Sequence, residues 1–173
     1  SLAGELRKWA DRLDTPGAAE ARRLRMPLEL FRLFERLKAV TPIATVLDVG
    51  ANQGEFSRWA AHCFPGADIH AFEPLAVCQQ SLQRVASSIP RMRIHAAALG
   101  ASCGQVEMFQ NDYAPSSSVL PMEDRHRELW PKTAGAKKIV VSIDTLDHFA
   151  AENAFKAPAL LKLDVQGFEM SVL

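Results

Sequence analysis

Residues 45–54, TVLDVGANQG, constrain the fold of this chain more than any other stretch. A β-branched apolar run stops there at an acid, Asp48, and two glycines, Gly50 and Gly54. This pattern is typical of a buried parallel strand that feeds a ligand-binding turn. Glycine is needed where the backbone turns sharply and approaches a ligand closely. A helix starting near Glu55 would aim its free N–H groups at the same place, so the sequence predicts a bound cofactor there.

The spacing of the turn separates two classes of cofactor. A nicotinamide fingerprint is G-x-G-x-x-G with an acid about twenty residues further on. Residues 48–54 read Asp-x-Gly-x-x-x-Gly instead, so the middle glycine, which would grip a pyrophosphate, is absent. The turn resembles that of Rossmann-like methyltransferases that use S-adenosyl-L-methionine (SAM). Glu73 closes the next expected strand, 69–72, where a carboxylate can accept hydrogen bonds from both ribose hydroxyls.

Several short motifs then follow in one order along the chain. They are DVGANQG at 48–54, AFEP at 71–74, ALG at 98–100, SSS at 116–118, TLD at 145–147 and LKLDVQGFE at 161–169. In this order and spacing the chain resembles the FkbM-type methyltransferase family over residues 43–173. The resemblance implies a class I, Rossmann-like fold and SAM-dependent O-methylation of a hydroxyl on a sugar, polyketide or similar small metabolite.

The predicted cofactor contacts lie in the turn and at the ends of the following strands. They are Asp48, Gly50, Asn52, Gln53, Gly54, Glu73, Pro74 and Ala98. Asp48 would orient the amides of the loop or meet the ammonium of the cofactor, and the alternative is a role in loop structure alone. Asn52 and Gln53 would bind the polar end of the cofactor or satisfy the backbone of the turn.

Asp164 is the predicted catalytic base. It stands at the carboxyl end of the strand expected at 159–164, where it could take the proton of an acceptor hydroxyl. The alternative is a buried hydrogen-bond acceptor that orients the next loop. Glu169 would serve as the base instead, or would pair with Lys162. A lysine inside a core strand needs a carboxylate partner, so Lys162 indicates a structural ion pair.

The first forty residues are predicted to form a helical extension outside the methyltransferase domain, which we place at 41–173. One expected helix has its apolar face at 2–13, the Pro16-Gly17 pair ends that run, and Pro27 opens a second helix. These helices would cap the edge of the sheet. The alternatives are a lid over the substrate or a contact between two copies of the chain in a homodimer.

From residue 43 onward the pattern alternates strand, helix, strand, helix, strand. This alternation predicts an α/β fold with a doubly wound, mostly parallel Rossmann-like sheet. Segments 106–110 and 138–143 are expected to form an inserted hairpin-like pair, and 159–164 the fourth core strand, beside the first. The ligand would bind in the crevice between the carboxyl ends of these two strands. We expect the sheet to be truncated after this strand, with the C-terminal part of the domain missing.

Composition limits the partners. Twenty basic and twenty acidic residues cancel, so no net charge attracts the chain to nucleic acid or to an anionic membrane. The three cysteines lack C-x-x-C spacing, which favours a reduced, cytoplasmic protein. The five histidines show no H-x-x-x-H spacing and no pairing with an aspartate on one element, so no metal site is predicted. Asp144, Asp147 and Asp164 form only a loose acidic set, and Asp144 and Asp147 flank an expected helix start at Thr145.

The leading prediction is therefore a SAM-dependent O-methyltransferase that acts on a small-molecule acceptor with a hydroxyl. Two alternatives stay open at this point. One is a non-catalytic module that binds SAM or a nucleotide, because an intact binding turn does not prove turnover. The other is a nicotinamide-dependent oxidoreductase.

Overall fold

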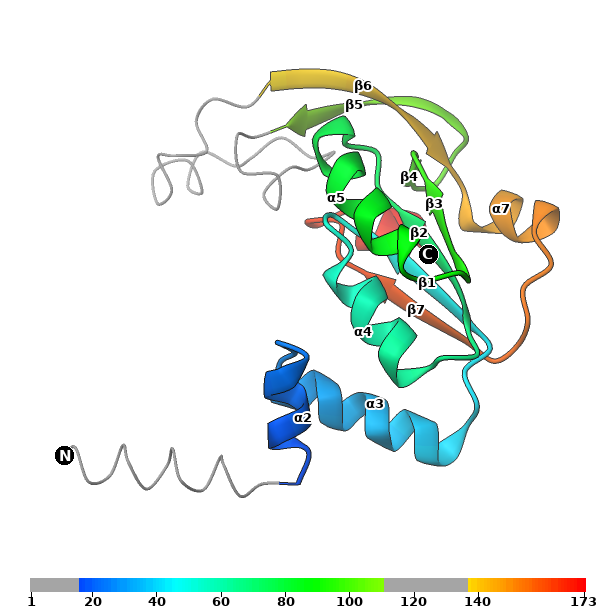
Figure 1. The fold of residues 1–173 in the computed structure, drawn as a ribbon. Helices are drawn as coiled ribbons and strands as arrows, with labels where there is room; N and C mark the ends of the chain where they lie inside the picture. Colours follow the sequence, from blue (N-terminus) through cyan, green and yellow to red (C-terminus); the bar gives the residue numbers. More distant parts are fainter. Residues whose placement is uncertain (1–15, 111–136) are drawn as a thin grey trace.

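A four-stranded parallel sheet, here called sheet A, forms the centre of the computed structural model, which describes residues 16–110 and 137–173 (Figure 1). Its strands lie in the order β3-β2-β1-β7. Their bounds are β1 (Thr45–Val49), β2 (Asp68–Phe72), β3 (Met92–His95) and β7 (Ala159–Leu163). This order confirms the predicted α/β class and the place of the fourth core strand beside the first.

The register brings the carboxyl ends of the central strands to one edge. Val49 at the end of β1 lies opposite Phe72 of β2 and Leu163 of β7. All five residues of β1 are buried, as predicted for a buried parallel strand, and polar Thr45 and charged Asp48 are among them. Loops that follow these three strands therefore meet at one edge of the sheet.

Two helices connect the first three strands and cover one face of sheet A (Figure 1). Helix α4 (Glu55–Cys63) begins directly after Gly54, and α5 (Ala76–Ser87) follows β2. Ala60 of α4 and Leu82 of α5 pack with Val46 of β1 in the main hydrophobic core. The predicted helix start after the glycine turn is confirmed.

The N-terminal helices join the same core. Helix α3 (Leu28–Val40) begins after Pro27, as predicted, and a short helix α2 (Ala18–Arg23) precedes it. Phe34 of α3 is buried, and the centroid of its ring lies 5.6 Å from that of Phe56 and 5.1 Å from that of Phe64. The helix expected at 2–13 lies outside the described residues. None of the helices in the described ranges is long and apolar enough to cross a membrane.

A second, three-stranded sheet, sheet B, is inserted after β3. Its strands β4 (Ala98–Leu99), β5 (Gly104–Gln110) and β6 (Lys137–Asp144) lie in the order β4-β6-β5. Strands β5 and β6 are antiparallel, which confirms the predicted inserted pair. The two-residue strand β4, parallel to β6, was not predicted.

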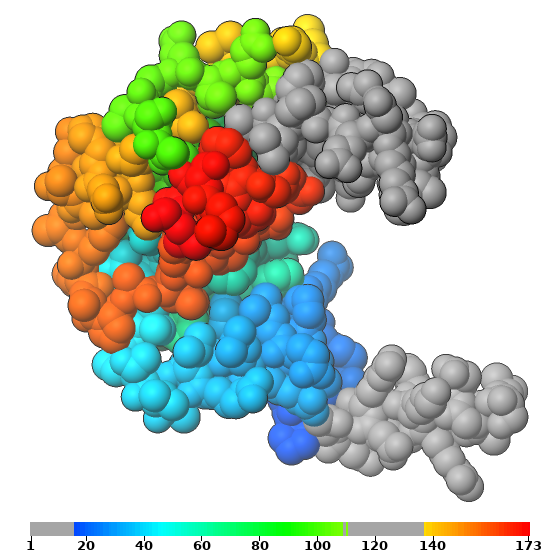
Figure 2. Space-filling model, turned by 180° about the vertical axis from the view of Figure 1, so that it is seen from behind, coloured from blue at the N-terminus to red at the C-terminus, as the bar shows by residue number. Residues whose placement is uncertain are grey.

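The other face of sheet A packs against the last helices. Leu47 and Val49 contact Phe149 of α7 (Leu146–Glu152) and Val172 of α8 (Glu169–Val172) in a second core. From behind, the C-terminal segment, in red, lies between the blue α3 and the green and yellow strands of sheet B (Figure 2). Helix α7 starts where predicted, because the Thr145 side chain accepts a hydrogen bond from the His148 N–H at 3.0 Å.

A buried histidine, His70, and a half-buried one, His95, lie within an aromatic cluster on this second face. His70 Nδ1 lies 3.1 Å from His95 Nε2, so the two rings share a hydrogen bond. His95 stacks on Phe72 with ring centroids 4.7 Å apart and meets the edge of Phe149 at 4.6 Å. Burial, with smaller contributions from His70 and Arg93, lowers the pKa of His95 to about 4. Burial also lowers the pKa of His70.

This pair predicts a loss of stability in mild acid. Unfolded histidine has a pKa of about 6.5. Since the folded pKa values are lower, the unfolded state binds more protons below that pH, and stability falls as the pH drops from about 6.5 toward 4. We expect about 2–3 kcal/mol to be lost by pH ~4.5. In urea titrations across this pH range, the His95→Phe variant should lose less free energy of unfolding than the wild type. His62→Ala, which lies outside the cluster, should lose as much as the wild type. If the free energy of unfolding had the same slope against pH in the wild type and in His95→Phe, this account would be contradicted.

Candidate functional site

A cavity, here called the edge cavity, lies at the carboxyl edge of sheet A. It is bounded by the turn after β1, the end of β2, strand β4 and the segment after β7. Six of the predicted site residues line it: Gly50, Asn52, Glu73, Pro74, Ala98 and Asp164. The fold thus brings together residues from four separate segments, at the switch point where α/β sheets bind ligands.

Glu73 joins two of these segments. The residue is only 4% exposed, and its carboxylate accepts hydrogen bonds from the Asn52 N–H at 2.8 Å and the Leu75 N–H at 2.9 Å. Burial raises the pKa of Glu73, and these two backbone hydrogen bonds oppose that rise. A carboxylate has about four acceptor positions, so two remain for a ligand after both backbone bonds are made.

Gly50 allows the turn to lie against the end of β7. Its φ is +74°, and a Cβ atom built there would lie 2.1 Å from the Asp164 carbonyl oxygen. Any side chain at this position would separate β1 from the segment after β7. Only glycine fits, which explains why the predicted turn needs one there.

Asn52 and Gln53 point to different surroundings. Asn52 has a left-handed backbone, with φ 49°, and its side-chain oxygen accepts a hydrogen bond from the Cys78 thiol at 3.2 Å. Gln53 is exposed and lines a second hollow rather than the edge cavity. Gly54 lines neither and precedes α4, where a Cβ would lie 2.9 Å from a methyl group of Leu82.

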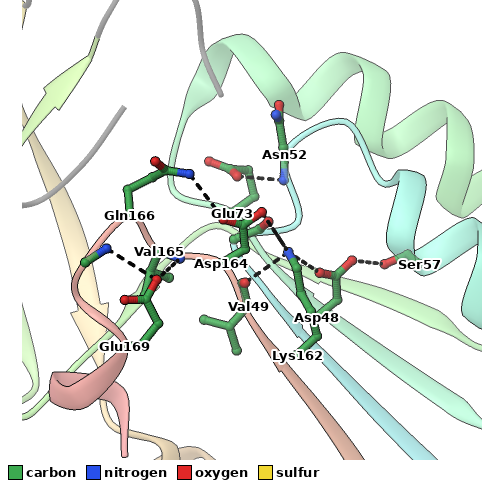
Figure 3. Close-up of polar contacts among 12 residues, drawn as sticks. Asp48, Val49, Asn52, Ser57, Glu73, Lys162, Asp164, Val165, Gln166 and Glu169 are labelled. Carbon is green, nitrogen blue, oxygen red and sulfur yellow. Dashed lines mark hydrogen bonds and ion pairs between the residues drawn. The ribbon is translucent and has the colours of Figure 1, made fainter. Parts of the chain in front are cut away.

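Asp48 lies inside the sheet and is not part of the lining of the edge cavity. Figure 3 shows its side chain between Lys162 and Ser57. The side chain is fully buried, and its Oδ2 accepts a hydrogen bond from the Ser57 hydroxyl at 2.7 Å. Its Oδ1 makes no hydrogen bond among the described residues but lies 3.0 Å from the Lys162 ammonium. Lys162 therefore links Asp48 to the turn, through the carbonyl oxygen of Gly50.

Lys162 links the two central strands to the turn. Besides pairing with Asp48, its ammonium donates to the carbonyl oxygens of Gly50, at 2.7 Å, and Val49, at 3.3 Å. These contacts match the three donors of an ammonium group, so the charge is held in place by the turn and the strand. The ammonium also lies 5.8 Å from the centre of the Phe56 ring.

The structural ion pair predicted for Lys162 is confirmed, but its partner is Asp48, and the alternative pairing with Glu169 is wrong. Lys162 lies directly opposite Asp48 in the β1–β7 register, whereas Glu169 accepts hydrogen bonds from the backbone N–H groups of Val165 and Gly167 at 3.1 and 3.3 Å. Glu169 thereby closes the loop that follows β7. Motif spacing could not reveal this, because β1 and β7 are distant in the sequence and their register is set by packing.

Asp164 lies at the junction of the edge cavity and the second hollow. It lines both, and its side chain is 59% exposed, unlike the buried acceptor of the alternative prediction. Its Oδ1 accepts a hydrogen bond from the Gln166 amide at 3.2 Å, and its Oδ2 lies 3.9 Å from the Lys162 ammonium. The second hollow, here called the Trp59 hollow, is also lined by Gln53, Glu55, Phe56, Trp59 and Lys162.

Sequence reasoning missed several residues of the edge cavity. Its apolar walls include Leu75, Leu99, Met108 and Phe168. Phe168 lies within the last motif, so its position was a usable signal. Met108 had none, because it reaches the cavity from the inserted sheet B. The serine triplet at 116–118 lies outside the described residues.

Comparisons with known proteins agree with this architecture. The family model described as "Methyltransferase FkbM domain" matches residues 48–173. The chain is 28% identical over 151 residues to methyltransferase sdnD of Sordaria araneosa, covering 74% of this chain and 58% of that protein. It is 24% identical over 187 residues to 2-O-methyltransferase NoeI of Sinorhizobium fredii, covering 100% of this chain and 70% of that protein. Methyltransferase 1 of Beauveria bassiana is 26% identical to the chain over 140 residues, covering 74% of this chain and 56% of that protein.

The geometry of Lys162 predicts a large effect on stability. Lys162→Met would leave the fully buried Asp48 carboxylate with Ser57 as its partner, and we expect a loss of about 2–4 kcal/mol in urea unfolding. The control Lys38→Met removes only the exposed pair with Glu35 and should change stability by less than about 1 kcal/mol. Adding Asp48→Asn to Lys162→Met should restore part of the loss. A Lys162→Met protein as stable as Lys38→Met would rule out this role.

Proposed function

The chain belongs to the FkbM methyltransferase family, and we propose that it uses SAM to methylate a hydroxyl of a small metabolite or sugar. The observation that carries the proposal is the convergence of Gly50, Glu73 and Asp164 on the edge cavity. The chain spans 58% of the length of the Sordaria protein, so the activity of the whole protein belongs to this proposal.

The lining of the edge cavity fits the parts of SAM. Glu73 has two acceptor positions left for the ribose hydroxyls once its backbone bonds are made. The apolar side chains of Leu99, Met108 and Phe168 suit a flat purine ring. Gly50 and Asn52 would lie at the polar end of the cofactor, with Pro74 and Ala98 along its length.

The missing middle glycine and the family together argue against the nicotinamide alternative. The turn after β1 lacks the glycine that admits a pyrophosphate. SAM has no pyrophosphate and carries a sulfonium methyl group, so this turn suits it better. We therefore take SAM as the methyl donor.

We propose Asp164 as the base of the reaction. Methyl transfer forms an oxygen–carbon bond while the carbon–sulfur bond breaks and its electron pair stays on sulfur, so the protein mainly positions the acceptor oxygen. An aliphatic hydroxyl must also lose its proton, and the exposed carboxylate of Asp164, at the junction of the two hollows, can accept it.

The Trp59 hollow suits a polyhydroxylated acceptor. Its aromatic residues, Trp59 and Phe56, offer apolar faces, and Gln53, Glu55 and Asp164 offer hydrogen-bonding groups. Transfer to oxygen is further supported by the similarity to a protein named as a 2-O-methyltransferase. Balanced formal charges favour a small-molecule acceptor over nucleic acid. A cytoplasmic location and a homodimer stay predictions.

Calorimetry can test the role of Glu73. Glu73→Gln keeps the size of the side chain but removes one acceptor and the charge, so SAM should bind about 10–100-fold more weakly, the cost of losing a charged hydrogen-bond partner. Glu107→Gln, which changes an exposed carboxylate on β5, should bind SAM as the wild type does. NAD should bind to none of these proteins. Equal SAM affinity for Glu73→Gln and Glu107→Gln would remove Glu73 from the site.

Single-turnover kinetics can test the role of Asp164. In the whole protein, Asp164→Asn should leave SAM affinity nearly unchanged and lower the rate of transfer to an alcohol acceptor by about 10²-fold or more, the scale for a positioned proton acceptor. Asp147→Asn, an exposed aspartate on α7, serves as the control. A mutant rate within about threefold of wild type at saturating SAM would exclude Asp164 as the base.

A further inference from the structure

Three side chains able to bind a metal ion meet at one end of sheet B. Cys103 lies between β4 and β5, Asp144 is the last residue of β6, and His148 lies in α7. The Cys103 sulfur is 3.0 Å from Asp144 Oδ1, and His148 Nδ1 is 2.8 Å from the same oxygen. One ligand atom from each residue lies within 4.8 Å of the other two. Figure 1 shows α7 and the β4–β5 connection at the same end of the sheet.

We propose that Cys103, Asp144 and His148 form a binding site for a divalent cation of the zinc class. Thiolate, carboxylate and imidazole are all zinc ligands, and three protein ligands leave a fourth tetrahedral position for water. A thiolate and a carboxylate together neutralise a divalent charge. Binding requires Cys103 to lose its thiol proton and His148 to present the free lone pair of Nδ1, so metal uptake releases a proton.

The surroundings of the cluster support metal binding. A histidine that binds a metal usually donates its other ring N–H to a carboxylate or carbonyl, which fixes its orientation. The other nitrogen of His148, Nε2, lies 3.6 Å from the Glu152 carboxylate. Asp144 is also fixed, because its Oδ1 accepts a hydrogen bond from the Thr145 N–H at 2.8 Å. Cys103 and His148 are exposed, so an ion can enter from solvent.

A bound ion would add one more link among the start of β5, the end of β6 and α7. Strand β4 has two residues, and the Gly100 N–H that follows it donates to the Asp144 carbonyl at 2.9 Å. Ala98 and Leu99 of this strand also line the edge cavity. A cation held by Cys103, Asp144 and His148 would brace that wall from outside. This inference does not depend on the methyl donor or on the acceptor.

Spectroscopy with cobalt(II), which commonly substitutes for zinc, gives a direct test. The reduced chain should take up one cobalt ion and show sulfur-to-cobalt charge-transfer absorption in the near ultraviolet. Cys103→Ser should abolish that band, and His148→Ala should weaken zinc binding by more than about 100-fold in chelator competition, while Glu152→Gln should weaken it by about 10-fold. The controls His62→Ala and Asp147→Asn should bind as the wild type does.

A labelling experiment on the wild-type chain avoids any effect of the variants on folding. Cys63 and Cys78 are buried and Cys103 is exposed, so iodoacetamide should modify Cys103 first. Zinc should slow that modification, measured by peptide mass spectrometry, by at least about 10-fold, because a ligated thiolate is a poorer nucleophile. An unchanged labelling rate with zinc, or a cobalt spectrum that survives Cys103→Ser, would overturn the proposal.

Discussion

The ion pair between Lys162 and Asp48 is the interaction on which the geometry of the site depends. The two residues face each other across the two central strands, and Asp48 is fully buried. A buried carboxylate is costly unless it is paired, and a one-residue slip of β7 would turn Lys162 to the opposite face of the sheet. The pair therefore favours a single β1–β7 register. The same ammonium binds the Gly50 carbonyl, so the register also fixes the turn.

Glu73 and Gly50 complete this arrangement by opposite means. Glu73 adds contacts, since its carboxylate binds the Asn52 N–H in the turn after β1 and the Leu75 N–H after β2. Gly50 removes an obstacle, since no side chain would fit against the Asp164 carbonyl. Together they bring the turn, the end of β2 and the segment after β7 within reach of one ligand.

Sheet B gives the chain features that the parallel sheet alone would lack. Met108 and Leu99 supply part of the apolar wall of the edge cavity, and both come from the inserted strands. At its outer end the same sheet brings Cys103 beside Asp144 and His148. Residues that no local motif connects thus meet because β4 and β5 both pair with β6.

The sequence by itself determined the types and order of the main elements, without the short strand β4, and the core of the candidate site. The apolar run before Asp48, the glycines of the turn and the acid at 73 are local signals, because strand burial, tight turns and helix starts depend on neighbouring residues. Only the tertiary structure decided that Lys162 pairs with Asp48 rather than Glu169, that Met108 reaches the edge cavity, and that Cys103 meets His148. These contacts depend on strand register and sheet insertion, which arise from packing between segments distant in the chain, and no spacing within one segment encodes them.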